Sequence, residues 1–317
     1  MLRNERIWRF LCGWVILVCS CAVFPSRLLA ADELEQLLRS EYDDKTFVLR
    51  GFYQGERLRY DASGLPVGSG SPGDWTVSGL VRVSSVDLSE GLLTIQGDRL
   101  FVVNLGQGFE FEADARKKKQ DKAQRAGRLK IEVDLDRAGV TADKAEALLS
   151  KVFLTNKDRF AELVPDYWKP CALTASAGLS TKLYKACSFP REFAAIPGLV
   201  ASPGEYAESE LAGPEKQTSE DLRDRSGRKF DPPRPISNPD PKFPNDARQA
   251  KYQGGVLLLF VVDKAGRVQN IRILRPRGFG LEEKAVETVA TWRFKPAERD
   301  GQPIDKEMAV QIDFHLY

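Results

Sequence analysis

The chain has 317 residues, of which 42% are hydrophobic and 29% are charged, so it is long enough for about two domains with their own hydrophobic cores. Its formal net charge is only +2, which sets up no strong field toward nucleic acid or acidic lipid. The composition therefore argues against a nucleic-acid-binding protein.

Residues 1–31 have the pattern of an export segment. Three arginines precede an apolar run at residues 10–24, which is shorter than the roughly 18 to 20 residues needed to cross a bilayer. This length favours a cleaved signal peptide, with cleavage beside Ala30 or Ala31. Two alternatives stay open: a retained inner-membrane anchor, and a lipid attached within residues 18–21, which loosely resemble a lipoprotein box.

The region from residue 32 to residue 200 is predicted to form a β-rich domain after a short helix. Its candidate strands lie at residues 46–52, 56–60, 75–86, 92–95, 99–103, 109–112 and 128–135. They alternate hydrophobic and polar residues, which indicates an antiparallel sheet or a small barrel with one solvated face. The pattern points to no particular family.

Two further segments of this region are predicted to form a loop and a helix. The basic segment at residues 116–125 favours a solvated loop between two strands, and a patch for anionic lipid or envelope glycan is the alternative. Thr141 is predicted to cap a helix whose apolar stripe faces the core.

Two cysteines, Cys171 and Cys187, lie in the body of the chain, whereas the other three lie inside the apolar run at residues 10–24. An even pair in an exported protein predicts a disulfide, which stabilises a loop of this size by about 3 kcal/mol in the chain-entropy model. Two unrelated buried thiols are the alternative. No histidine lies near the pair, so the spacing does not indicate a zinc site.

Residues 201–240 are rich in Pro, Glu, Ser and Asp and contain few large apolar side chains. A segment of this composition cannot bury enough apolar surface to offset its conformational entropy. We therefore expect a disordered linker between two folded domains.

Residues 241–317 show a more specific succession of elements. The expected elements are a helical turn at residues 243–250, strands at 255–262 and 268–275, a helix at 281–292 and a final strand at 309–317. The first two strands form an antiparallel hairpin, because a tight Gly-containing turn connects them. The helix is amphipathic, with Glu282, Glu283, Lys284 and Glu287 around its apolar stripe. This order predicts the α+β class.

Several spaced motifs in this region resemble the C-terminal domain of the TonB family. These motifs are Phe243-Pro244 with Ala247, the turn at residues 263–267, Trp292-Arg293-Phe294 with Pro296-Ala297, and Asp300-Gly301-Gln302-Pro303. The resemblance covers about a quarter of the chain. It implies a β-hairpin, a helix and a third antiparallel strand, joined by the linker to the β-rich N-terminal domain.

In the TonB family the last strand of this domain receives the short N-terminal box of outer-membrane receptors by strand addition. By resemblance, the partner-binding residues are Phe243, Pro244, Val310, Gln311, Ile312, Asp313 and Phe314. The implied partners are a receptor peptide or another envelope protein, together with inner-membrane proton-driven motor proteins. Pairing of the last strand within the chain, or with a second copy in a homodimer, is the alternative.

The resemblance implies an energy transducer of the periplasm of a Gram-negative-type cell. The alternative is an exported adaptor without energy coupling, because the apolar run lacks the histidine that such transducers use to couple to their motor. Enzyme chemistry is not expected. The only histidine, His315, is predicted on the polar face of the last strand without a recognisable nucleophile or orienting partner, and no metal or cofactor motif is present in the sequence.

Overall fold

The computed structural model of the chain describes residues 31–68, 70–111, 127–135, 141–178, 184–201 and 229–316. The predicted export segment up to residue 30, the basic segment at residues 116–125 and residues 202–228 of the predicted linker lie outside these ranges. We refer to residues 31–201 as the N-terminal domain and to residues 229–316 as the C-terminal domain.

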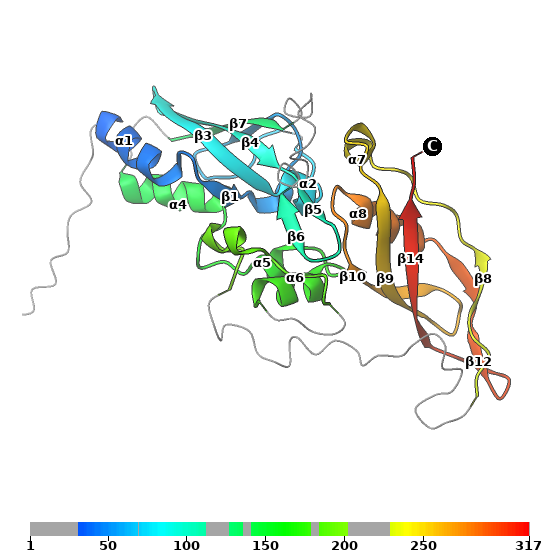
Figure 1. The fold of residues 1–317 in the computed structure, drawn as a ribbon. Helices are drawn as coiled ribbons and strands as arrows, with labels where there is room; N and C mark the ends of the chain where they lie inside the picture. The colour runs from blue at the N-terminus through cyan, green and yellow to red at the C-terminus, as the bar shows by residue number, and fades with distance from the viewer. Residues whose placement is uncertain are drawn as a thin grey trace, which may run out of the picture.

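A five-stranded sheet with the order β1-β3-β4-β7-β2 forms the centre of the N-terminal domain (Figure 1). Its strands are β1 (Thr46–Val48), β2 (Arg57–Tyr60), β3 (Leu80–Ser89), β4 (Leu92–Leu100) and β7 (Arg128–Asp134). Neighbouring strands are antiparallel, except that β2 and β7 run parallel. Helices α1 (Ala31–Tyr42) and α4 (Ala142–Val152) bury Leu38 and Leu149 against strand residues such as Ile131. The β-rich fold predicted for this region is confirmed.

Shorter elements form a second cluster beside this sheet. They are η1 (Arg50–Phe52), α2 (Trp75–Ser78), β5 (Val102–Asn104), β6 (Phe109–Phe111), α5 (Phe160–Leu163), α6 (Lys169–Ser176) and η3 (Arg191–Ala195). Trp75 is 2% exposed, and its ring centroid lies 5.2 Å from that of Phe109, 5.1 Å from that of Phe160 and 5.4 Å from that of Trp168. Aromatic packing of this kind contributes both buried area and edge-to-face attraction.

Part of the predicted strand at residues 75–86 is wrong, because its first four residues form α2. Asp74 caps this short helix, since its Oδ1 accepts a hydrogen bond from the backbone N–H of Thr76 at 2.6 Å. The cap outweighs the β propensity of the residues that follow it. The α4 helix begins as predicted, with Thr141 Oγ1 accepting from the N–H of Lys144 at 3.3 Å.

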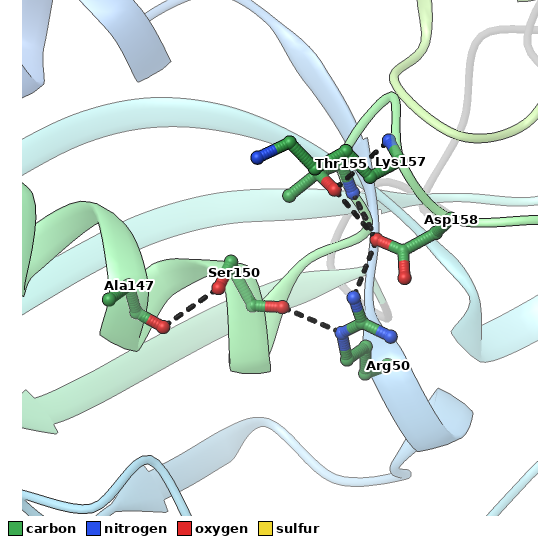
Figure 2. A network of polar contacts seen from close by, with 6 residues as sticks. All are labelled: Arg50, Ala147, Ser150, Thr155, Lys157 and Asp158. Atoms are coloured by element: carbon green, nitrogen blue, oxygen red, sulfur yellow. Dashed lines mark hydrogen bonds and ion pairs between the residues drawn. The ribbon is translucent and has the colours of Figure 1, made fainter.

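Arg50 joins three segments of the N-terminal domain (Figure 2). Its Nε donates to the carbonyl oxygen of Ser150 at 2.7 Å, and its Nη2 lies 2.5 Å from Asp158 Oδ2. The same carboxylate oxygen accepts hydrogen bonds from the backbone N–H of Thr155 at 2.7 Å and from its hydroxyl at 2.9 Å. The network therefore holds η1, the end of α4 and the turn before α5 together.

A three-stranded antiparallel sheet with the order β10-β9-β14 forms the centre of the C-terminal domain (Figure 1). Its strands are β9 (Gly254–Val262), β10 (Val268–Arg275) and β14 (Lys306–Phe314). Helix α7 (Asn245–Gln249) precedes β9, and α8 (Leu281–Val289) buries Leu281, Ala285 and Val289 in the core. The predicted α+β arrangement of hairpin, helix and third antiparallel strand is confirmed.

Short strands that the sequence pattern does not predict accompany this sheet. β8 (Arg234–Ser237) pairs with β11 (Arg293–Lys295), and β12 (Ala297–Arg299) pairs with β13 (Gln302–Ile304). β8 lies in the range predicted as linker, and β14 begins three residues before the predicted final strand. The α8 helix ends before Trp292, whose indole instead packs beside Phe294 and donates to the carbonyl oxygen of Pro239 at 3.1 Å.

The two domains share one hydrophobic cluster, so they are packed against each other. The ring centroids of Phe101 and Phe279, one from each domain, are 5.1 Å apart. The backbone N–H of Ile273 in β10 donates to the carbonyl oxygen of Tyr167 at 3.0 Å. The N-terminal domain therefore contacts the outer edge of β10.

Candidate functional site

Strand β14 lies at an edge of the C-terminal sheet. It pairs with β9 over nine residues, from Lys306 opposite Val262 to Phe314 opposite Gly254. In the part of the chain that the structure describes, no strand pairs with its other side. The opposite edge of the sheet, along β10, contacts the N-terminal domain through Tyr167. The sheet therefore has one covered edge and one open edge.

The side chains of β14 alternate between the core and the solvent. Ile312 and Phe314 are 5% and 2% exposed, and Val310 is half-buried beside them. Gln311 and Asp313 are exposed. Of the five predicted partner-binding residues in this strand, these two present their side chains to solvent, whereas the buried ones offer a partner chiefly their main chain.

The exposed side chains of β14 belong to a polar ladder across the sheet. Gln311 Oε1 accepts from Arg275 Nη2 at 2.5 Å, and Gln311 Nε2 donates to Asp313 Oδ1 at 2.8 Å. Gly255 lies opposite Asp313, and a Cβ atom there would come within 2.4 Å of Asp313 Oδ1. The glycine therefore leaves room for the ladder, which holds Gln311 and Asp313 beside the open edge.

Of the remaining two predicted residues, Phe243 contacts the C-terminal end of β14 and Pro244 begins α7. The rings of Phe243 and Phe314 meet edge to face with centroids 5.7 Å apart, and the guanidinium of Arg248 lies 5.9 Å from the ring centroid of Phe243. Pro244 is buried at the N-cap of α7. The structure thus brings Phe243 to the strand, while Pro244 positions the helix that follows.

Cys171 and Cys187 are joined by a disulfide, with their Cα atoms 5.2 Å apart. Both are buried, and Cys187 Sγ lies 3.9 Å from the carbonyl oxygen of Leu274 in β10. The bridge therefore ties α6 to a segment that contacts the C-terminal domain.

A cluster of three carboxylates that the sequence pattern does not predict lies where the two domains meet. Asp74 comes from the N-terminal domain, and Glu282 and Glu283 come from the first turn of α8; one oxygen of each lies within 4.8 Å of the other two. Glu282 is 0% exposed, so it does not lie on a solvated face of the helix. Its Oε1 accepts from the backbone N–H groups of Arg277 and, at 2.8 Å, of Gly278.

The other two carboxylates are anchored in the same way, through one oxygen each. Glu283 Oε1 accepts from Trp168 Nε1 at 2.8 Å, across the domain interface. Asp74 Oδ1 accepts from the N–H of Thr76, as the cap of α2. Each of the three side chains is thereby held in a fixed orientation.

Burial and electrostatic repulsion shift the acidity of this cluster. Burial, followed by the nearby Asp74 carboxylate, raises the pKa of Glu282 to about 7, although the backbone N–H donors oppose this shift. Burial and the same aspartate also raise the pKa of Glu283 well above its ordinary value. Both shifts favour the protonated forms of Glu282 and Glu283.

The histidine predicted on the polar face of the last strand, His315, is exposed just beyond the end of β14.

None of the helices in the described ranges is long and apolar enough to cross a membrane.

The C-terminal domain is similar in sequence to known proteins. Residues 239–316 match the family model for the Gram-negative bacterial TonB protein C-terminal region. The chain is 34% identical over 82 residues to protein tonB2 of Pseudomonas aeruginosa, covering 26% of the chain and 30% of that protein. It is 31% identical over 77 residues to protein TonB of Xanthomonas campestris pv. campestris, covering 24% of the chain and 34% of that protein. A solution NMR structure of the Pseudomonas aeruginosa TonB C-terminal domain aligns at 22% identity, over 26% of the chain and 86% of that structure, with a TM-score of 0.23.

The C-terminal domain thus belongs to the class of small α+β modules with an open sheet edge. The family match and the two relatives identify residues 239–316 as a TonB C-terminal domain. The chain spans about a third of the length of these relatives, and the rest of the chain lies outside the match.

Proposed function

We propose that the C-terminal domain binds an extended segment of a partner protein by strand addition to β14. The observation that carries this proposal is that β14 pairs only with β9 among the residues that the structure describes. An open edge offers a row of backbone N–H and C=O groups, and main-chain hydrogen bonds to an incoming peptide supply most of the affinity in this mode of recognition.

The polar ladder gives the edge some selectivity. Gln311 and Asp313 are exposed beside it, and an alternate residue of an added strand lies directly across from each of them. The Asp313 carboxylate favours a basic or hydrogen-bond-donating residue at that position of the peptide. Phe243, at the end of the strand, adds an apolar contact.

We infer that the partner is the N-terminal box of an outer-membrane receptor. The match of residues 239–316 to the TonB C-terminal family model supports this inference, because the resemblance to that family implies this partner. In this account the protein is an energy transducer of the periplasm, coupled to proton-driven motor proteins of the inner membrane. The alternative is a periplasmic adaptor that uses the same edge without energy coupling. Retention of the N-terminal segment separates the two, because force is transmitted only by a chain that stays attached to its motor.

The binding mode is tested with synthetic peptides that carry receptor box sequences, titrated calorimetrically into the full chain. In an added strand, successive N–H groups point alternately toward and away from the neighbouring strand. N-methylation of single peptide residues is therefore expected to abolish binding at every second position and to be tolerated at the positions between. If N-methylation abolished binding at positions that do not alternate along the peptide, strand addition would be contradicted.

The energy-transducer assignment is tested on the native protein by intact mass, N-terminal sequence and partition between membrane and soluble fractions. A full-length N-terminus in the inner membrane supports energy coupling. A mature protein that begins near Ala31 and is found in the soluble fraction would rule out energy coupling and support the periplasmic adaptor.

A further inference from the structure

The carboxylate cluster at the domain interface has three oxygen atoms without a partner. Asp74 Oδ2, Glu282 Oε2 and Glu283 Oε2 are buried and accept no hydrogen bond from any residue that the structure describes. The cost of burial is greatest for Glu282, because its side chain is 0% exposed and its Oε2 accepts no hydrogen bond from the described residues. Burying carboxylate oxygens without compensation is strongly unfavourable.

We propose that Asp74, Glu282 and Glu283 together bind one divalent cation that prefers oxygen ligands, with Ca²⁺ as the best candidate. Carboxylate oxygens are the ligands that Ca²⁺, Mg²⁺ and Mn²⁺ select. Oxygens bound to one Ca²⁺ lie up to about 5 Å apart, since each is about 2.3–2.6 Å from the ion. In the cluster, one oxygen of each carboxylate lies within 4.8 Å of one oxygen of each of the other two, which meets this condition.

The other oxygen of each carboxylate supports this assignment. All three accept hydrogen bonds from the protein, so the free oxygens are fixed in direction in the way that outer-shell contacts orient metal ligands. Asp74 and Glu283 are only half-buried as whole residues, so the cluster lies close to the protein surface.

The charge of the site is compatible with a dication. Metal binding displaces protons from its ligands, and the three carboxylates then carry three negative charges, whereas the N-terminus of α8 contributes only about half a positive charge. That partial charge opposes a cation, but it is smaller than the summed charge of the three side chains.

The position of the site has a structural consequence that does not depend on peptide binding at β14. Its ligands come from both domains, Asp74 from one and the α8 glutamates from the other. An ion held by all three therefore stabilises the packed arrangement of the domains.

The site is tested with the purified full chain after treatment with a chelator. Ca²⁺ is expected to bind with a stoichiometry of one in calorimetry and to raise the melting temperature. Tb³⁺, which substitutes for Ca²⁺, is expected to give luminescence on tryptophan excitation, because Trp168 donates to the ligand Glu283. Excess Ca²⁺ is expected to displace this signal.

Two isosteric variants remove ligands while retaining the local hydrogen bonds. In Glu282→Gln the amide oxygen still accepts from the N–H groups of Arg277 and Gly278, and in Asp74→Asn the helix cap is kept. Each is expected to weaken Ca²⁺ binding by at least about tenfold. Glu287→Gln is the control, since Glu287 is exposed on the same helix and pairs only with Lys284, at 2.7 Å, in the described ranges.

Two results would overturn the proposal. One is the absence of calorimetric binding of Ca²⁺, Mg²⁺ and Mn²⁺ by the full chain at millimolar concentration. The other is unchanged Ca²⁺ affinity and Tb³⁺ luminescence in both Glu282→Gln and Asp74→Asn, which would place the ion elsewhere. Weaker Ca²⁺ binding and weaker Tb³⁺ luminescence in both variants, with both unchanged in Glu287→Gln, would support the site.

Discussion

The backbone N–H of Ile273 donates to the carbonyl oxygen of Tyr167 at 3.0 Å, across the boundary between the two domains. This bond lies on the outer side of β10, which is one of the two edges of the C-terminal sheet. Exposed edges promote unwanted pairing, and proteins commonly cover them. The N-terminal domain contacts this edge, so β14 is the edge that remains for the proposed pairing with a partner.

The close approach of the domains depends on Gly278. This residue has φ of 88°, and a Cβ atom there would lie 2.1 Å from the carbonyl oxygen of Val102 in the N-terminal domain. We expect Gly278→Ala to lower the free energy of unfolding by about 2–4 kcal/mol, through the strained backbone and the clash together.

Gly301→Ala provides the matched control for this prediction. Gly301 has φ of 76°, but no atom lies within 4 Å of the Cβ position. Its substitution is expected to lower stability by only about 1 kcal/mol, from backbone strain alone. Equal effects of the two variants in denaturant unfolding would show that the contact with Val102 is not important for stability.

The Asp158 network predicts a loss of stability in acid. Burial raises the pKa of Asp158, but hydrogen bonds from Arg50 and Thr155 outweigh burial and hold the pKa below its ordinary value. A carboxyl group with a lowered pKa in the folded state stabilises the fold fully above its unfolded pKa, about 3.9, and this contribution is lost as the pH falls through the folded pKa.

We therefore expect Asp158→Asn to lower the free energy of unfolding by about 1–3 kcal/mol at neutral pH, and its difference from the wild type to shrink below about pH 4. Denaturant unfolding at several pH values measures this. Asp166→Asn is the control, because Asp166 is 92% exposed and pairs with Lys169 at the surface, and it is expected to show little change. A difference that stays constant down to pH 2 would contradict the linkage.

The disulfide between Cys171 and Cys187 is expected to stabilise the N-terminal domain. Replacing both residues by alanine should lower the free energy of unfolding by about 3 kcal/mol, because the unfolded chain regains the freedom of the open loop. Reductant should destabilise the wild type and leave the double variant unchanged. Mass spectrometry of non-reduced proteolytic fragments reports the bridge directly, and two free thiols in the native protein would contradict it.

The elements of the C-terminal domain could be predicted because their signals are local. The apolar run of β9, the turn at residues 263–266 and the alternation in β14 each depend on neighbouring residues. The family resemblance implies that β14 binds a partner, which stays a prediction. The structure places Phe243 against Phe314 at the end of the strand.

Features that depend on contacts between distant segments could not be predicted in this way. β8 lies in a proline-rich stretch, and it becomes a strand only because β11 pairs with it. Glu282 has the same sequence signature as a solvent-facing helix residue, but it is buried where the start of α8 meets Asp74 of the N-terminal domain. No periodicity in the sequence distinguishes these cases from a linker or a solvated helix face.

Hydrogen exchange of the β14 amides, measured in the full chain with and without a bound receptor box peptide, tests the central claim most directly. Strand addition predicts that every second amide from Lys306 to Phe314 exchanges freely in the unbound protein and becomes protected in the complex. The amides of β10 should change little, because the N-terminal domain contacts that edge already. Peptide binding that leaves β14 exchange unchanged would contradict the account.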